Sequence, residues 1–190
     1  MTLETSLNTQ VTKMISFRND ILPLKNQLYR LALRITLDTA EAEDIVQETL
    51  IKIWNRRSSW DSIDNIEAFC FTVCRNLALD SIKRKDHSTA SLDEIMDAKA
   101  QMPLDGSGQS PTTPSQRAIA SDQVRIVRQI VDKLPEKQRT CIQLRDFEGK
   151  PYKDIAKIMG ISEEQVKINI FRGRKTIKEK FESLDNFRMT

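Results

Sequence analysis

Apolar residues recur at steps of three and four along most of this 190-residue chain, a spacing that predicts amphipathic helices. The helices are expected at about 20–36, 39–57, 65–85, 117–133, 135–147, 152–159 and 162–182. In the second, the apolar stripe runs from Ala42 to Trp54. Only 5 Gly and 6 Pro leave little room for a turn-rich β fold. The sequence therefore predicts an all-α protein.

Several predicted helices are preceded by residues that favour helix starts. Asp38 is a plausible N-cap, with Glu41 three residues later to complete a capping box. Either Asp64 or Asn65 can cap the third helix, after a loop at 55–64. Pro135 suits the first turn of its helix.

A change of composition divides the chain into two small helical domains. Residues 86–116 contain clusters of Ser, Asp, Gly and Pro, which predict a flexible linker. As a coil this linker would span roughly 30 Å, so the domains could bind separate sites. We expect a loose leader at 1–19, a first domain at 20–85, the linker at 86–116, a second domain at 117–184 and a tail at 185–190.

The charge distribution indicates two contacts with a polyanion. The net charge is +3 overall, but residues 165–180 carry +5 and residues 75–85 carry +3, whereas residues 86–117 carry −3. No run of 18 apolar residues exists, so direct membrane insertion is not expected.

Catalytic chemistry is hard to assemble from this sequence. His87 is the only histidine, and there is no glycine-rich phosphate loop or HExxH pair. The odd count of cysteines indicates a reducing compartment, and Cys70 and Cys74 are interpreted as small buried hydrophobes. We expect no enzyme activity, no metal and no cofactor, and the sequence assigns no role to Cys141.

Residues 152–171 have the pattern of a helix-turn-helix, whose second helix enters the DNA major groove. Ala156 allows a close helix crossing, Gly160 suits the turn, and Ser162 with Gln165 forms a capping box. Phe171 could either belong to the core or contact DNA. The alternative to DNA binding by the second helix is that it is an ordinary basic helix exposed to solvent. The DNA-binding candidates include the N-cap residue Ser162. The others are Glu164, Gln165, Lys167, Ile168 and Asn169 near base edges, and Arg172, Arg174 and Lys175 near phosphates.

Other runs distinguish among the many helix-turn-helix proteins. The run AEDIVQETLIKIW at 42–54 resembles the core-binding helix of bacterial sigma factors, and the run AFCFTVCRNLALDSIKR at 68–84 resembles their promoter-melting helix. The runs at 134–139 and 152–156 resemble the start of their upstream-element domain. Over about residues 20–182, the chain is similar to the extracytoplasmic-function group of RNA polymerase sigma factors.

This resemblance implies a cytoplasmic protein that directs transcription initiation and has core RNA polymerase, promoter DNA and an anti-sigma factor as partners. It implies that the second domain reads the −35 element. Polymerase contacts would fall on Asp44, Gln47 and Glu48. Contacts with the −10 element would fall on Trp60, Phe71, Asn76, Asp80, Lys83 and Arg84, although Trp60 and Phe71 could equally belong to the core.

The chain also departs from the family pattern. Ile168-Asn169 replaces the usual Ser-Arg of the recognition helix, and Gly173 replaces the more usual Ala, so the upstream DNA sequence cannot be carried over. The alternative function is a stand-alone helix-turn-helix repressor or activator, which would bind its operator without polymerase.

Overall fold

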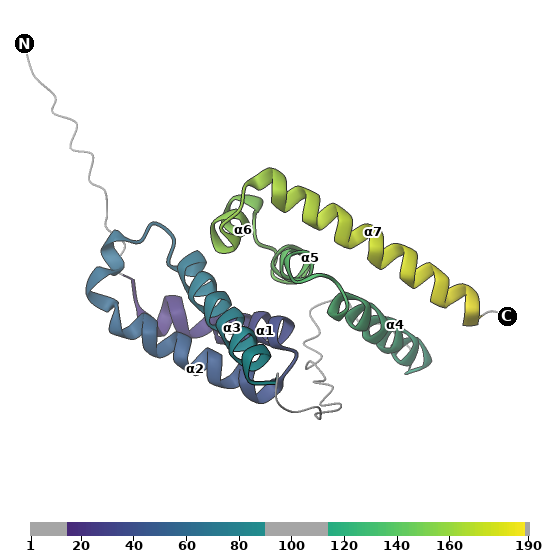
Figure 1. Cartoon of the computed structure of the whole chain (residues 1–190), viewed down its shortest axis with the longest axis horizontal. Helices are drawn as coiled ribbons and strands as arrows, with labels where there is room; N and C mark the ends of the chain where they lie inside the picture. The colour runs from purple at the N-terminus through teal and green to yellow at the C-terminus, as the bar shows by residue number, and fades with distance from the viewer. Residues whose placement is uncertain (1–14, 90–113, 189–190) are drawn as a thin grey trace, which may run out of the picture.

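The computed structural model describes residues 15–89 and 114–188, and within these ranges the regular elements are all helical. Figure 1 shows them as two groups that lie side by side, α1–α3 and α4–α7. The expected all-α fold is therefore confirmed.

The first group packs α1 (Lys25–Thr36), α2 (Thr39–Asn55) and α3 (Ile66–Thr89) against one another. The first α-helix begins later than the predicted position 20. A π-helical turn (Phe17–Ile21) and a 3-10 turn (Leu22–Leu24) precede it. Pro23 explains the difference, because its missing N–H and its ring are tolerated in a first turn but not inside a helix.

The second group contains α4 (Pro114–Asp132), α5 (Glu136–Ile142), a π-helical turn (Gln143–Phe147), α6 (Tyr152–Met159) and α7 (Glu163–Arg188). Helix α3 continues to Thr89 and α4 begins at Pro114, so the ends of the predicted linker at 86–116 are helical. Pro114 suits a first helical turn. The rest of the linker, and the leader up to residue 14, lie outside the described residues. Since no Gly or Pro follows residue 182, α7 also extends through most of the predicted tail.

Side-chain caps fix the starts of α2 and α3. Asp38 accepts a hydrogen bond from the Glu41 backbone N–H at 3.1 Å, and Asn65 accepts one from the Ala68 N–H at 2.9 Å. Both N-caps are consistent with the predictions. The capping box also predicts that the Glu41 side chain accepts from the Asp38 backbone N–H, and this was wrong. The Asp38 N–H donates to Thr36 Oγ1 at 3.3 Å, because the Glu41 carboxylate is held by Ser81 of α3.

The apolar stripe of α2 was largely predicted correctly. Ala42, Ile45, Val46 and Ile53 are buried, but Trp54 is 46% exposed, and its expected burial was wrong. Its indole lies at the end of α2, where it packs edge-on against Phe17 with ring centroids 5.2 Å apart.

Leu37 ends α1 in the left-handed region with φ 58, a conformation that costs a residue with a Cβ atom roughly 1 kcal/mol. We predict that Leu37→Gly raises the free energy of unfolding by up to about 1 kcal/mol, measured by urea denaturation. Gly160→Ala is the mirror control, because Gly160 has φ 64 and should lose stability with a Cβ. A Leu37→Gly variant less stable than the parent would contradict this assignment.

Candidate nucleic-acid interface

The turn before α7 orients this helix. Gly160 ends α6 in the left-handed region, and Ser162 Oγ accepts a hydrogen bond from the Gln165 backbone N–H at 3.2 Å. In return, Gln165 Oε1 accepts from the Ser162 N–H at 3.2 Å. This is a complete capping box, so the local geometry predicted for the helix-turn-helix is present.

One side of α7 is buried against the other helices of its group. Val166, Ile170 and Gly173 face inward, and a Cβ atom at Gly173 would lie 3.0 Å from Ile142 Cγ1. The glycine therefore allows α5 and α7 to approach closely. Gly173 in place of the more usual Ala is thus explained by the packing of α7 against Ile142.

Most of the predicted DNA-binding residues of α7 are exposed to solvent, whereas Arg174 lies beside the buried stripe and pairs with Asp146. Phe171 is 70% exposed, so it is not a core residue. Asn169 is half-buried, and its amide donates to the Gln165 carbonyl at 2.7 Å. The exposed candidates are Ser162, Glu164, Gln165, Lys167, Ile168, Arg172, Arg174 and Lys175.

Two charged residues on this helix have shifted pKa values. The pKa of Glu164 is lowered by a hydrogen bond from its own backbone N–H, which lies in the first turn and has no carbonyl partner within the helix. The Ser162 hydroxyl lowers it further. The pKa of Arg174 is raised because its guanidinium donates to both carboxylate oxygens of Asp146, with Nε 3.1 Å from Oδ2. Arg174 is thus held by an ion pair to the π-helical turn at Gln143–Phe147.

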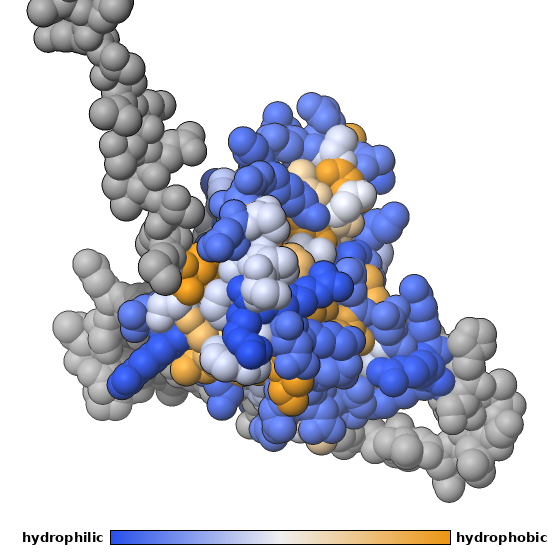
Figure 2. Space-filling model, turned by 90° about the vertical axis from the view of Figure 1, so that its left-hand side faces the viewer, coloured by the Kyte–Doolittle hydropathy of each residue, from blue (hydrophilic) through white to orange (hydrophobic). Residues whose placement is uncertain are grey.

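Figure 2 views the molecule from the side on which α7 begins. The surface there is mainly hydrophilic, with small separate hydrophobic patches. On α7 the exposed Lys167, Arg172 and Lys175 supply positive charge for a polyanion, and the exposed Ile168 and Phe171 supply apolar surface for base contacts.

The predicted polymerase-binding residues lie on one exposed face of α2. Asp44, Gln47 and Glu48 are all exposed. Ile51 is 59% exposed and Trp54 is 46% exposed, and both lie on the same face at helical spacing. The sequence reasoning missed these two. The signal was available, because positions 44, 47, 51 and 54 form a second stripe beside the buried one.

The predicted −10 residues, Trp60 before α3 and the others on it, divide into two kinds. Asn76, Asp80, Lys83 and Arg84 are exposed and share one face of the helix. Trp60 and Phe71 are only 7% and 0% exposed. The Trp60 indole N–H donates to the Ile53 carbonyl at 3.1 Å. Both aromatics therefore belong to the core, which was the alternative to a contact with the −10 element.

Phe71 is buried where the two helix groups meet. The Lys150 ammonium lies 4.6 Å from the centre of the Phe71 ring and also contacts Gln27 Oε1 at 2.8 Å and the Glu67 carboxylate. Lys150 immediately precedes Pro151 at the start of α6, so this contact joins α6 to α1 and α3.

A second set of contacts joins α1 to the same group. Arg34 is 1% exposed, donates to Gln143 Oε1 at 3.1 Å and pairs with Asp132. Arg30 binds both carboxylate oxygens of Glu148 at 2.8 Å. Because these ion pairs bring together residues about a hundred positions apart, no local sequence pattern could predict them.

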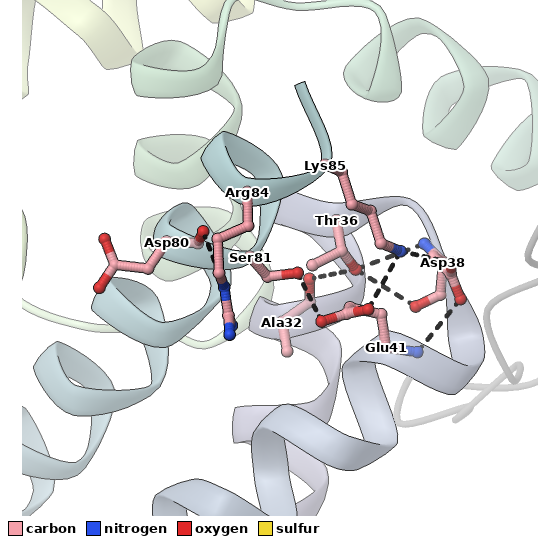
Figure 3. Close-up of polar contacts among 8 residues, drawn as sticks. All are labelled: Ala32, Thr36, Asp38, Glu41, Asp80, Ser81, Arg84 and Lys85. Atoms are coloured by element: carbon pink, nitrogen blue, oxygen red, sulfur yellow. Dashed lines mark hydrogen bonds and ion pairs between the residues drawn. The ribbon is translucent and has the colours of Figure 1, made fainter. Parts of the chain in front are cut away.

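The end of α3 is held to the start of α2 by a polar cluster (Figure 3). Lys85 Nζ lies 3.1 Å from Asp38 and 3.0 Å from Glu41, and Ser81 donates to Glu41. The backbone N–H of Glu41 lowers the pKa of Asp38 most strongly, and the Ser81 hydroxyl does the same for Glu41. The cluster fixes the part of α3 that carries Asp80 and Arg84.

This cluster predicts a pH dependence of stability. Because the folded-state pKa values of Asp38 and Glu41 are lowered, their contribution is present above the ordinary carboxyl pKa of about 4 and is lost as pH falls through the lowered values. We predict that Glu41→Gln lowers Tm at pH 7. The Tm of the variant should fall less on acidification than that of the parent, so that the two Tm values converge as the pH falls below about 4. Glu43→Gln, on the exposed side of α2, is the control. A constant difference in Tm across this pH range would contradict the prediction.

The three cysteines are buried and free. Burial raises the pKa of Cys70 and of Cys74 to about 12 and that of Cys141 to about 11, so their thiols stay protonated at neutral pH. No group of metal-ligating side chains is found within the described ranges. None of the helices in those ranges is both long and apolar enough to cross a membrane.

Comparison with known proteins identifies the family. Residues 21–88 match the family described as Sigma-70 region 2, and residues 125–177 match Sigma-70, region 4. The ECF RNA polymerase sigma factor SigL of Mycobacterium tuberculosis is 32% identical over 145 residues, which cover 74% of each chain. This chain belongs to the extracytoplasmic-function (ECF) family of RNA polymerase sigma factors.

Two further proteins resemble this sigma factor. A relative named "Probable RNA polymerase sigma factor RfaY", from Xanthomonas campestris pv. campestris, is 28% identical over 164 residues, which cover 86% of this chain but 40% of that relative. The sigma factor RpoE of Bartonella quintana, solved in complex with the anti-sigma factor NepR, has a TM-score of 0.71 at 24% identity and shares the fold over 89% of this chain and 98% of that one.

The matches also decide between the two functions considered. This sigma factor is a promoter-recognising subunit in transcription initiation. A stand-alone helix-turn-helix regulator is not favoured, because the match to region 2 accounts for α1–α3 as well.

Proposed function

We propose that this sigma factor binds core RNA polymerase through the exposed face of α2 and reads the −10 element with α3 and the −35 element with α7. It acts in the cytoplasm and catalyses no reaction itself. The exposed face of α7 carries this proposal, because a capped helix offers polar and basic residues on the side opposite its buried stripe.

The polymerase contact combines charge with apolar surface. Charged and hydrogen-bonding groups come from Asp44, Gln47 and Glu48. Apolar surface, exposed to solvent in the free protein, comes from Ile51 and Trp54. Aromatic anchors surrounded by polar groups are typical of stable protein interfaces.

Contact with the −10 element falls to the exposed face of α3. Lys83 and Arg84 can contact phosphates, and Asn76 can hydrogen-bond to a base. Phe71 can stack on an unpaired base only after α6 has moved away from α3, since its ring is covered in the docked arrangement.

Reading both elements at once requires the two helix groups to separate. The centres of the −10 and −35 elements lie about 25 base pairs apart, which is roughly 85 Å along the DNA at 3.4 Å per base pair. In the structure the groups are docked through direct contacts of Arg30, Arg34 and Lys150. The free protein should therefore bind promoter DNA weakly, and binding to polymerase should favour the separated arrangement.

An anti-sigma factor completes the proposed set of partners. The solved RpoE chain that shares this fold is in complex with the anti-sigma factor NepR. By analogy, we expect a protein that holds this sigma factor away from polymerase.

A binding assay with and without core polymerase tests the proposal. Promoter duplexes would first be selected by the reconstituted holoenzyme from a random library, and their affinity would then be measured by fluorescence anisotropy. The expected result is at least about 100-fold tighter binding when core polymerase is present. Equal affinity without polymerase would instead support a stand-alone regulator.

A further inference from the structure

We propose that Ile168 recognises the C5-methyl group of a thymine in the −35 element. This inference rests on the proposed function of α7 and names the base feature that one of its residues reads. It starts from an unusual placement: Ile168 is a large apolar side chain, 47% exposed, and Gln165, Arg172 and Lys175 beside it on α7 are polar or charged.

The position of Ile168 is central to the solvent face of α7. At about 100° per residue, Ile168 lies roughly opposite Ile177 and 160° from both Val166 and Ile170, which pack toward the protein core. Gln165, Arg172 and Lys175 lie within about 60° of it on the helical wheel. A helix docked with its solvent face in the major groove therefore places Ile168 toward the base edges, with Arg172 and Lys175 one and two turns further on.

The fold gives no separate reason for isoleucine here. Its side chain takes no part in the capping box, which uses Ser162 and Gln165. A β-branched residue is also a weaker helix former than the lysine or glutamate that an exposed position usually carries.

The chemistry of the side chain limits what it can read. Isoleucine neither donates nor accepts a hydrogen bond, and the methyl group of thymine is the apolar group that a base pair presents in the major groove. The nearby amides are partly committed: Gln165 Oε1 accepts from Ser162 N–H, and the Asn169 amide donates to the Gln165 carbonyl. Phe171, one turn along and 70% exposed, extends the apolar surface.

Replacing thymine by deoxyuridine tests this assignment, because deoxyuridine keeps the base pair and removes only the methyl group. The holoenzyme would be reconstituted from core polymerase and the full chain, and each thymine of a selected −35 element would be replaced in turn. At one position, we expect the affinity of the parent holoenzyme to fall about fourfold, the effect of one buried methyl group. The Ile168→Ala holoenzyme should bind thymine and deoxyuridine at that position equally well.

Lys175→Ala is the matched control on the same face. It should weaken binding to thymine and deoxyuridine duplexes alike and reduce the salt dependence of binding. A parent holoenzyme that binds the promoter but tolerates every deoxyuridine would overturn the assignment, as would a thymine preference that persists in Ile168→Ala. A selected −35 element without thymine would overturn it as well. Failure of the holoenzyme to select any promoter would instead overturn the proposed function of α7.

Discussion

Asp44→Arg is expected to lower the affinity of the chain for core polymerase by at least about tenfold, because a reversed charge at the centre of a polar contact costs more than its removal. Asp44 lies on the exposed face of α2, away from the buried stripe of Ala42, Ile45 and Val46. The fold should therefore be unaffected. Affinity would be measured with immobilised core polymerase, and the fold by circular dichroism.

The matched control for this variant is Asp61→Arg, which makes the same change at an exposed position outside α2. It should bind core polymerase like the parent chain. If Asp44→Arg also retained full affinity, the exposed face of α2 would not be the contact surface. Ile51→Ala and Trp54→Ala would extend the test to the apolar residues on this face.

Arg34→Met is expected to reduce the free energy of unfolding by about 2 kcal/mol, because removing the guanidinium leaves the buried Gln143 side-chain oxygen without its donor. Gln143 is fully buried and accepts from Arg34, and Asp132 would lose its ion pair. Urea denaturation of the full chain measures the loss. The radius of gyration from X-ray scattering should also rise, since Arg34 joins α1 to the second helix group.

Lys178→Met controls for the loss of an ordinary surface charge. Lys178 lies 3.8 Å from Glu182 on the exposed side of α7, and such pairs contribute less than about 1 kcal/mol. Its variant should unfold like the parent. Equal unfolding energies and equal radii for Arg34→Met and the parent would show that these contacts do not hold the groups together.

Local features were predicted best from the sequence. Gly160, Ser162 and Asp38 have roles that depend on backbone geometry and on neighbours within four residues, and the structure places each as expected. The buried stripe of α2 followed from helical spacing alone. Position 54 was the exception, because a tryptophan at helical spacing fits a buried stripe and an exposed one equally well.

Contacts between the two helix groups were not predictable. Arg34 and Lys150 are charged residues that average rules place in solvent, yet they are 1% and 7% exposed. Their burial depends on partners such as Gln143 and Glu67, which only the folded chain brings near. The burial of Phe71 follows from the same docking, so the sequence left its position open.

Run-off transcription with purified core polymerase and the full chain measures whether this sigma factor directs transcription from its promoter. We expect a promoter-specific transcript from templates that carry the selected −10 and −35 elements, and its loss when either element is scrambled. Core polymerase that gives no specific transcript with this chain, although the chain is folded, would contradict this expectation.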